Sequence, residues 1–334
     1  MKTPISEEAA LLHEDAFFVD LHCDLLLTTL LTGWQWDRLH KPNPLPGSPL
    51  MGHVDIPRLK AGGVNGLGLG IVTLPFMGKK TIEYQVDLFE KRLATHDNEL
   101  GLARTAAEML QLKESGKIAC FLGLEGVHSL HGDWSTLPAL AQRGLLYTGL
   151  VHFTRNQAAS PMVGLGANPD RPLTELGREL IQTLHENQIL VDVAHLNRAG
   201  LFEVCESSPQ PIICSHTACN AVHGSPRGLD PDALKAIANT GGVVGVIFVS
   251  FFIGRGGIQQ VVRHLNHIRN TAGIEACAIG TDWEGFALYP DDLNSAEKLP
   301  MLTQALLDAG WSASDIKKAY GENFLRVVKA ARGS

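Results

Sequence analysis

Polar side chains of the kinds that bind metals or transfer protons stand at the carboxyl end of most apolar, β-branched runs of the sequence. Imidazole nitrogens and carboxylate oxygens are ligands that Zn²⁺ takes at about 2.0–2.2 Å. In a barrel of parallel strands, the carboxyl ends of the strands meet at one rim, where the catalytic groups lie. The side chains in these positions are His22, Asp24, Glu125, His152, His195, His216 and Asp282.

The first two of them, His22 and Asp24, lie two residues apart. Residues two apart on a strand face the same side, so both can point into a barrel mouth while Cys23 points toward the surrounding helices. An imidazole beside a carboxylate suits Zn²⁺. Taken alone, however, such a pair is more often a His–Asp hydrogen bond in a protein core.

Glu125 and two later histidines extend the pattern. A carboxylate at the end of an apolar run is costly to bury unless it is paired or bound to a metal. The two oxygens of Glu125 can bridge two metals, and a salt bridge to a Lys or Arg is the alternative. His195 and His216 follow consecutive strand runs. With His22 and Asp24, these residues form a coherent two-metal set that leaves a coordination position for water.

Asp282 and Arg227 have side chains that suit the rest of a hydrolytic reaction. A free carboxylate at the rim can take a proton from water and pass it to a leaving amine, which is one role for Asp282. The alternative is the N-cap of a helix. Arg227 lies on the loop after the sixth strand run, and its planar guanidinium matches a carboxylate. A loop arginine is otherwise usually a solvated surface charge.

The elements that must position these residues alternate between short apolar strands and longer helical segments. This alternation predicts parallel strands, because a parallel crossover usually contains a helix. We expect eight strands, at Phe17–Asp24, Val64–Leu74, Ile118–Glu125, Leu145–His152, Ile189–His195, Pro211–His216, Gly242–Val249 and Ala276–Asp282. The expected helices are Ile82–Ser115, Ser135–Arg143, Thr174–Asn187, Asn197–Ser207, Asp232–Thr240, Ile258–Ala272, Ala296–Ala309 and Ser312–Ala331.

Eight such units without a break in composition favour a closed (β/α)8 barrel formed by residues 1–334 as a single domain. An open doubly wound sheet is the alternative. It would carry a glycine-rich phosphate loop after the first strand, where this chain has His22-Cys23-Asp24. The segments Gly33–Gly63 and Phe153–Pro172 are expected to be long loops over the catalytic face.

Composition and charge exclude several classes of protein. The net charge is -7, which argues against binding to nucleic acid or to anionic membranes. The apolar stretch Gly241–Gly254 has too few residues to span a bilayer, and the acidic N-terminal segment does not resemble a secretory signal. The six cysteines form no CxxC pair and are interpreted as reduced thiols. We therefore expect a cytoplasmic protein.

The motifs, taken together and in order, resemble the membrane (renal) dipeptidase family of zinc peptidases, peptidase family M19, among the amidohydrolase-like barrels. The resemblance covers nearly the whole chain. It rests on Asp20-Leu21-His22-Cys23-Asp24, His53-Val54-Asp55-Ile56-Pro57-Arg58-Leu59 with Gly62-Gly63-Val64, Gly123-Leu124-Glu125-Gly126, Leu173-Thr174 through Gly177-Arg178-Glu179-Leu180, Val191-Asp192-Val193-Ala194-His195, Ser215-His216, Pro226-Arg227 and Gly280-Thr281-Asp282.

This resemblance implies a (β/α)8 metallo-dipeptidase with two Zn²⁺ that activate water for attack on the peptide bond. It implies dipeptide substrates, often with a D-residue in second position, and a possible homodimer. His22 and Asp24 would bind one zinc, His195 and His216 the other, and Glu125 would bridge them; His152 would polarise the scissile carbonyl, Asp282 would shuttle the proton, and Arg227 would bind the substrate carboxylate.

The chain departs from the family pattern at three places outside the metal ligands. Ile247-Phe248-Val249 stands where relatives often have Asn-Phe-Tyr, Glu284 where they have Asp, and Gly228 where they often have Asn. These departures affect which dipeptide fits. Two other functions remain as alternatives. Another barrel hydrolase, for an amide, lactone or phosphoester, often has His-x-His on its first strand and a modified lysine as bridge. A catalytically silent binding barrel would have lost ligands.

Overall fold

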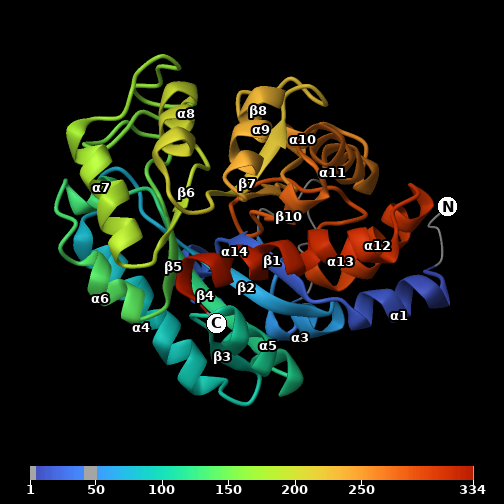
Figure 1. Ribbon diagram of the computed structural model, residues 1–334. Coiled ribbons are helices and arrows are strands. Elements are labelled where there is room, and N and C mark those ends of the chain that lie inside the picture. The colour runs from blue at the N-terminus through green and yellow to red at the C-terminus, as the bar shows by residue number, and fades with distance from the viewer. Residues whose placement is uncertain (1–4, 41–50, 334) are drawn as a thin grey trace.

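The computed structural model of this chain describes residues 5–40 and 51–333, and within them parallel strands form a nearly closed barrel surrounded by helices (Figure 1). The strands of the barrel follow the order β1-β2-β4-β5-β6-β7-β9-β10, while β3 pairs with β4 and β8 with β7. Their bounds are β1 Phe18–Cys23, β2 Val64–Val72, β3 Leu100–Leu102, β4 Ile118–Glu125, β5 Leu145–Gly149, β6 Leu190–Asp192, β7 Ile213–Cys219, β8 Gly228–Leu229, β9 Val243–Val246 and β10 Cys277–Ile279. This arrangement confirms the predicted (β/α)8 barrel.

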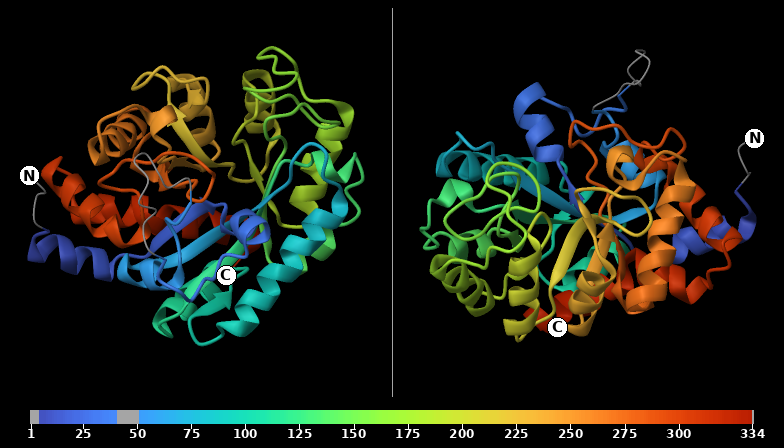
Figure 2. Two further views of the ribbon diagram at one scale, coloured as in Figure 1. Left: turned by 180° about the vertical axis from the view of Figure 1, so that it is seen from behind. Right: turned by 90° about the horizontal axis from the view of Figure 1, so that it is seen from above.

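Helices cover the outside of the barrel (Figure 2). Their bounds are α1 Glu7–Asp15, α2 Leu25–Thr32, α3 Ile56–Ala61, α4 Lys79–Thr95, α5 Ala106–Glu114, α6 Leu137–Gln142, α7 Glu175–Glu186, α8 Arg198–Ser207, α9 Pro231–Asn239, α10 Ser250–Ile253, α11 Ile258–Ala272, α12 Leu299–Asp308, α13 Ala313–Lys317 and α14 Asn323–Arg332. Short 3₁₀ turns lie at His128–Leu130, Ile274–Ala276 and Ala296–Lys298, and a π-helical turn at Lys318–Glu322 joins α13 to α14.

Two apolar clusters stabilise this arrangement. One lies between the strands and the helical layer, and the other fills the barrel interior. The interior cluster contains Leu21 of β1, Phe121 of β4 and Ile213 of β7, and it continues into Phe324 and Val327 of α14. Helix α14 therefore closes one end of the barrel. The polar side chains at the carboxyl ends of the strands lie at the opposite end.

The gap between the first and last strands is closed by backbone hydrogen bonds just beyond their ends. The N–H of Asp24 donates to the carbonyl of Trp283 at 2.8 Å, and the N–H of Asp282 donates to the carbonyl of His22 at 3.0 Å. The buried carboxylate of Asp20 adds to this closure, because it accepts the N–H and hydroxyl of Thr281 at 2.8 and 2.6 Å. Barrel closure thus brings His22, Asp24 and Asp282 together.

Several predicted elements are wrong in extent. The predicted helix Ile82–Ser115 is two helices, α4 and α5, separated by β3, whose backbone pairs with β4. The capping box of Thr105 and Glu108 starts the second helix, a local signal that a continuous helix would not contain. The predicted loop Gly33–Gly63 contains helix α3, whose N-cap is Asp55. Residues 41–50 of this predicted loop lie outside the described structure.

Six predicted strands, those of β1, β2, β5, β6, β9 and β10, end earlier than expected, and the last four do so by three residues. β5 ends at Gly149 instead of His152, β6 at Asp192 instead of His195, β9 at Val246 instead of Val249, and β10 at Ile279 instead of Asp282. The apolar runs continue beyond the strands because the first residues of the following loops are buried as well. Asp24 likewise lies after β1, at the N-cap of α2, so strand alternation does not explain its position.

Candidate metal centre

The three histidines from β1, the β6 loop and β7 converge on one carboxylate oxygen at the rim of the barrel. Oε1 of Glu125 lies 2.8 Å from Nε2 of His195, 3.4 Å from Nε2 of His216 and 3.8 Å from Nε2 of His22. The other oxygen of Glu125, Oε2, lies 3.7 Å from Nε2 of His152. The end of β4 therefore places one carboxylate between ring nitrogens that come from four other segments.

A second group of atoms lies on the β1 side of this centre. Nε2 of His22 is 3.2 Å from Oδ1 of Asp24 and 3.9 Å from Oδ1 of Asp282. Three overlapping groups have ligand atoms within 4.8 Å of one another: His22, Glu125 and His216; Glu125, His152 and His195; and His22, Asp24 and Asp282. The structure thus brings together all seven rim residues that the sequence singled out.

The donor set fits a metal better than it fits a network of hydrogen bonds. Nε2 of His22 and Oδ1 of Asp24 are buried and have no hydrogen-bond partner. Nε2 of His195 and Nε2 of His216 face each other at 3.0 Å. Buried polar atoms without partners are uncommon, and a cation between these lone pairs would satisfy them together.

Two hydroxyl groups fix the orientation of the histidine rings from behind. Nδ1 of His22 lies 2.8 Å from the hydroxyl of Tyr147, and that hydroxyl donates to the carbonyl of Leu21 at 2.8 Å. The Tyr147 oxygen is then free to accept the Nδ1 proton, which leaves the lone pair of Nε2 for the cavity. Outer hydrogen bonds of this kind set the tautomer and direction of metal-binding imidazoles.

His216 has a corresponding support from β6. Its Nδ1 lies 3.0 Å from the hydroxyl of Ser215, which donates to Oδ2 of Asp192 at 2.5 Å. The other oxygen of Asp192 accepts the backbone N–H of Ser215 and of Ala194, each at 2.9 Å. Asp192 thereby holds the chain segments of both His195 and His216.

Two glycines make room for this arrangement. A Cβ atom on Gly123 of β4 would lie 1.9 Å from Cζ of Tyr147, so a side chain there would displace the tyrosine that supports His22. A Cβ atom on Gly70 of β2 would lie 2.8 Å from Oδ1 of Asp24 and from Cε1 of His22. The lack of a side chain at these strand positions is therefore a steric requirement of the site.

The backbone at the site is held in unusual conformations. His195 and Asp282 have φ values of 64° and 59°, in the left-handed region that residues other than glycine rarely adopt. Such conformations cluster at functional sites, where surrounding structure holds a side chain in a required direction. Here they turn the chain immediately after β6 and β10, so that both side chains point into the rim.

The electrostatics of the site are those of a buried cluster of carboxylates and imidazoles. Burial alone lowers the pKa of His22, but Glu125, Asp24 and Asp282 outweigh it and raise this pKa to about 10. Burial and the charge of His22 lower the pKa of His216 to about 3. Burial, followed by the charge of Asp24, raises the pKa of Asp282 well above its usual range. Without a metal, the His22 ring is therefore protonated near neutral pH, and Asp282 holds its proton more tightly than an ordinary aspartic acid.

A cavity of about 460 Å³ opens directly above these groups. Asp24, Glu125, His152, His195 and Asp282 lie at its base. Its remaining lining residues are Leu27, Val72, Leu74, Phe153, Arg227, Val249, Phe251, Phe252, Gly285, Phe286 and Ala287. The size is that of a small-molecule site, and the polar groups converge at one end of it.

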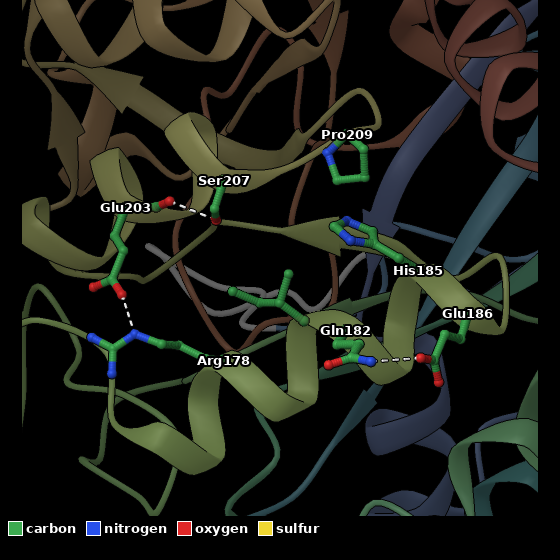
Figure 3. A pocket seen from close by; sticks show the side chains of 8 residues that line it. Arg178, Gln182, His185, Glu186, Glu203, Ser207 and Pro209 are labelled. Carbon is green, nitrogen blue, oxygen red and sulfur yellow. Dashed lines mark hydrogen bonds and ion pairs between the residues drawn. The ribbon is translucent and has the colours of Figure 1, made fainter.

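Another pocket lies on the outside of the barrel, between α7 and α8 (Figure 3). Its polar side chains are occupied with one another: Arg178 donates to Glu203 at 2.6 Å, and Gln182 donates to Glu186 at 2.8 Å. His185 lies 3.0 Å from the hydroxyl of Ser208. This pocket contains none of the three groups of potential metal ligands found among the described residues.

Residues 6–333 of the chain match the family described as membrane dipeptidase, peptidase family M19. The chain belongs to this family. As a member of the membrane dipeptidase family it is a metallodipeptidase, a hydrolase that acts on dipeptides. Within the described residues, none of the helices combines the length and the apolar character that crossing a membrane requires.

Solved structures of similar fold include three peptidases. A metallopeptidase from Rhodobacter sphaeroides, liganded with a phosphinate mimic of the dipeptide L-Ala-D-Ala, has a TM-score of 0.84 and 24% identity, with 95% of this chain and 100% of that chain covered. The probable dipeptidase PvdM from Pseudomonas aeruginosa has a TM-score of 0.86 and 20% identity, with 98% of each chain covered. The dipeptidase AC of family M19 has a TM-score of 0.83 and 23% identity, with 96% and 99% covered. All three support the barrel fold.

The residues that support the candidate ligands were not predicted from the sequence. Tyr147 lies inside the β5 run and gave no local signal. Asp20 and Asp192 interrupt apolar runs two and three residues before a histidine, which is a usable signal. Glu284, one of the three departures from the family pattern, is buried and accepts the backbone N–H groups of residues 52–54 at distances from 2.6 to 3.1 Å. It anchors the end of the loop after α2.

Proposed function

We propose that this metallodipeptidase is a binuclear zinc enzyme that hydrolyses dipeptides, including those with a D-residue in second position. The observation that carries the proposal is the convergence of Nε2 of His22, His195 and His216 on Oε1 of Glu125, with Asp24 beside His22. In this assignment His22 and Asp24 would hold one zinc, His195 and His216 would hold the other, and Glu125 would be shared between them. When bound, zinc polarises the scissile carbonyl and lowers the pKa of a water molecule.

Arg227 is assigned to the carboxylate of the dipeptide. Its side chain is 1% exposed and lines the cavity, and no carboxylate of the described residues forms an ion pair with it. Its guanidinium contacts only uncharged acceptors, the sulfur of Met162 at 3.6 Å, Nε2 of His195 at 3.0 Å and the carbonyl of His216 at 3.4 Å. A buried cation is costly unless it is paired, and the substrate carboxylate would supply the missing charge.

Asp282 and His152 are assigned to proton transfer and to the scissile carbonyl. Burial and the charge of Asp24 raise the pKa of Asp282, so its carboxyl group holds a proton more readily than an ordinary aspartate and can pass it to the departing amine. His152 lies in the cavity beside Glu125 and packs edge-on against His195, so its imidazole can donate to a developing oxyanion. The phosphinate mimic of L-Ala-D-Ala bound by the Rhodobacter sphaeroides relative supports a substrate of L–D configuration.

We further propose a cellular location and an oligomeric state for the enzyme. We place the enzyme in the cytoplasm and expect a homodimer, with no nucleic acid or membrane as partner. An amidohydrolase-type reaction on another amide, a lactone or a phosphoester remains the second candidate, because the metal centre alone does not select the bond. A dipeptide differs from these substrates in having both a free amino group and a free carboxylate. A requirement for both groups on the substrate would therefore identify a dipeptidase.

A direct test is hydrolysis of L-Xaa–L-Xaa and L-Xaa–D-Xaa dipeptides by the zinc-loaded enzyme, with a chelator-treated sample as the control. The metal content per chain is measured on the same preparation. We expect release of free amino acids that stops on chelation, and about two zinc ions per chain. Two bound zinc ions without turnover of any dipeptide would overturn the proposed substrate, and one zinc ion with full turnover would overturn the binuclear centre.

A further inference from the structure

The walls of the cavity above the metal centre are almost entirely apolar. On the side of β9 and β10 they consist of Val249, Phe251, Phe252, Phe286 and Ala287. Leu27, Val72 and Leu74 form the side of β1 and β2. Val249, one of the departures from the family pattern, belongs to this wall. The cavity therefore surrounds a bound molecule with hydrocarbon, except at its base.

Each charged group of the cavity already has a role in the proposed function. Asp24, Glu125 and His195 belong to the metal centre. Asp282 is assigned to protonation of the departing amine, and Arg227 to the carboxylate of the substrate. Among the described residues, the lining contains no further Lys, Arg, Asp or Glu. A charged side chain on the substrate would lose its hydration without gaining a partner, which is unfavourable for an isolated ion.

The position of Arg227 identifies which substrate side chain meets the aromatic wall. The guanidinium carbon of Arg227 lies 5.8 Å from the centre of the Phe252 ring. A carboxylate on Arg227 would place the Cα of the C-terminal residue beside it, because Cα is bonded to the carboxyl carbon. The side chain of that residue then lies within reach of Phe252 and of Val249, which immediately precedes α10.

The segment that carries this wall is held firmly in place. The N–H of Ser250 donates to the carbonyl of Leu288 at 2.8 Å, which joins α10 to the loop after β10. At the other end of α10, Nε2 of His264 donates to the carbonyl of Ile253 at 3.1 Å, while its Nδ1 accepts the N–H of Cys219 at 2.9 Å. A wall positioned by both neighbouring elements can select a substrate without first being ordered.

We propose that the enzyme selects dipeptides whose C-terminal side chain is apolar and bulky, through contact with Val249, Phe252 and Phe286. This inference rests on the proposed dipeptidase function and on the assignment of Arg227 to the substrate carboxylate. Within it, the C-terminal side chain packs against the aromatic wall, and acidic and basic side chains are excluded because the described lining residues offer no free charge to meet them.

The test compares kcat/KM of the zinc-loaded enzyme for L-Ala–Gly, L-Ala–Leu, L-Ala–Phe, L-Ala–Glu and L-Ala–Lys, with L and D forms of each chiral second residue. We expect the leucine and phenylalanine substrates to exceed the glutamate and lysine substrates by about ten-fold or more, since one methylene alone is worth about that much in an apolar pocket. Equal rates across the panel would overturn the inference and leave the dipeptidase function intact. No turnover of any member would instead overturn the function.

Two substitutions test whether this wall selects the C-terminal side chain of the substrate. Phe252→Ala is expected to lower kcat/KM for L-Ala–Leu by about ten-fold more than kcat/KM for L-Ala–Gly, because glycine has no side chain to lose contact, while any effect through Arg227 is common to both substrates. Phe251→Lys is expected to raise the relative rate for L-Ala–Glu, since Phe251 is 70% exposed and lines the cavity. Phe76→Lys is the matched control, because Phe76 is 82% exposed and is not among the lining residues.

The variants also distinguish the loss of a contact with the substrate from a general loss of folding or of zinc. A melting temperature and zinc content equal to those of the wild type show that a variant is folded and loaded. If Phe252→Ala lowers the rates for L-Ala–Gly and L-Ala–Leu equally in such a protein, the contact with the C-terminal side chain is refuted. An apolar preference that appears only at the N-terminal residue, in a panel of Xaa–Gly dipeptides, would refute it as well.

Discussion

The hydroxyl of Tyr147 lies 2.8 Å from Nδ1 of His22 and donates its own proton to the carbonyl of Leu21. When the His22 ring is neutral, as metal binding requires, this relationship assigns its proton to Nδ1 and directs Nε2 toward the cavity. Tyr147 is buried, and burial raises its pKa well above the usual range, so the hydroxyl stays neutral and keeps its role as a donor to Leu21. A strand residue outside the rim thereby orients the imidazole of a proposed metal ligand.

Removal of this hydroxyl should weaken metal binding. Tyr147→Phe keeps the ring that packs against Gly123 but leaves Nδ1 of His22 without its acceptor. We expect an affinity for zinc about 10–100-fold below that of the wild type, the usual effect of losing an outer hydrogen bond. Competition with a chromophoric chelator measures it. Tyr320→Phe is the control, because Tyr320 is also buried but pairs with Thr303; equal affinities in both variants would refute the role of Tyr147.

Asp282→Asn tests proton transfer separately from metal binding. The amide is nearly isosteric with a carboxyl group but cannot carry the proton between water and the departing amine. We expect zinc content close to that of the wild type and kcat lower by about 10²–10⁴-fold, the range for general acid–base catalysis. Turnover measured on L-Ala–D-Ala together with metal analysis checks both. An unchanged kcat in the zinc-loaded variant would exclude Asp282 as the proton carrier.

Arg227→Met tests recognition of the substrate carboxylate. We expect kcat/KM for L-Ala–L-Ala to fall by about 30-fold or more, mainly through KM, because the lost partner of a charged group costs about 2 kcal/mol or more. L-Ala–L-Ala amide, which has no carboxylate, serves as the control substrate. The wild type should prefer the free acid strongly and the variant should not. A preference that survives in the variant would place the carboxylate elsewhere.

Zinc binding should release protons near neutral pH. In the metal-free protein the pKa of His22 is raised to about 10, so its ring is protonated at pH 7.5, and metal binding requires the neutral ring. We expect the apparent affinity for zinc to rise with pH from 6 toward 9, and about one proton per chain to be released at pH 7.5. Isothermal titration calorimetry in buffers of different ionisation enthalpy counts these protons. Binding enthalpies that do not depend on the buffer would contradict the prediction.

His264 should make the fold sensitive to acid. Burial, offset in part by the carbonyl of Ile253, lowers the pKa of His264 to about 4. Because this folded-state pKa lies below the value of 6.5 for an unperturbed histidine, protons favour the unfolded chain. The contribution of His264 to stability is complete above pH 6.5 and decreases as the pH falls toward 4, by about 3 kcal/mol in total.

His264→Gln removes this titration while keeping one acceptor and one donor for Cys219 and Ile253. Denaturant unfolding of both proteins between pH 4 and pH 7 gives the free energy of unfolding as a function of pH. The variant should lose less stability than the wild type over this range, although it is less stable at pH 7. Parallel curves for the two proteins would show that His264 does not titrate in this window.

The sequence by itself determined the barrel, its approximate strands and the seven rim residues. Strand order follows from the alternation of elements, and polar residues at the carboxyl ends of apolar runs are detectable because burying them without a partner is costly. His152, His195 and Asp282 were found in this way, although the strands end before them. In each case the apolar run of the sequence continues past the end of the strand into the following loop. An apolar run therefore indicates that a segment is buried, and does not show where its β-sheet hydrogen bonds end.

Tertiary structure alone decided which groups support and surround these residues. Tyr147 reaches His22, from which it is separated by 125 positions, only because β5 lies near β1 across the barrel interior and Gly123 between them has no side chain. The wall formed by Val249, Phe252 and Phe286 likewise comes from segments that follow two different strands, β9 and β10. Such contacts depend on the closure of the barrel and on side-chain volume, and a linear pattern of residue types contains neither.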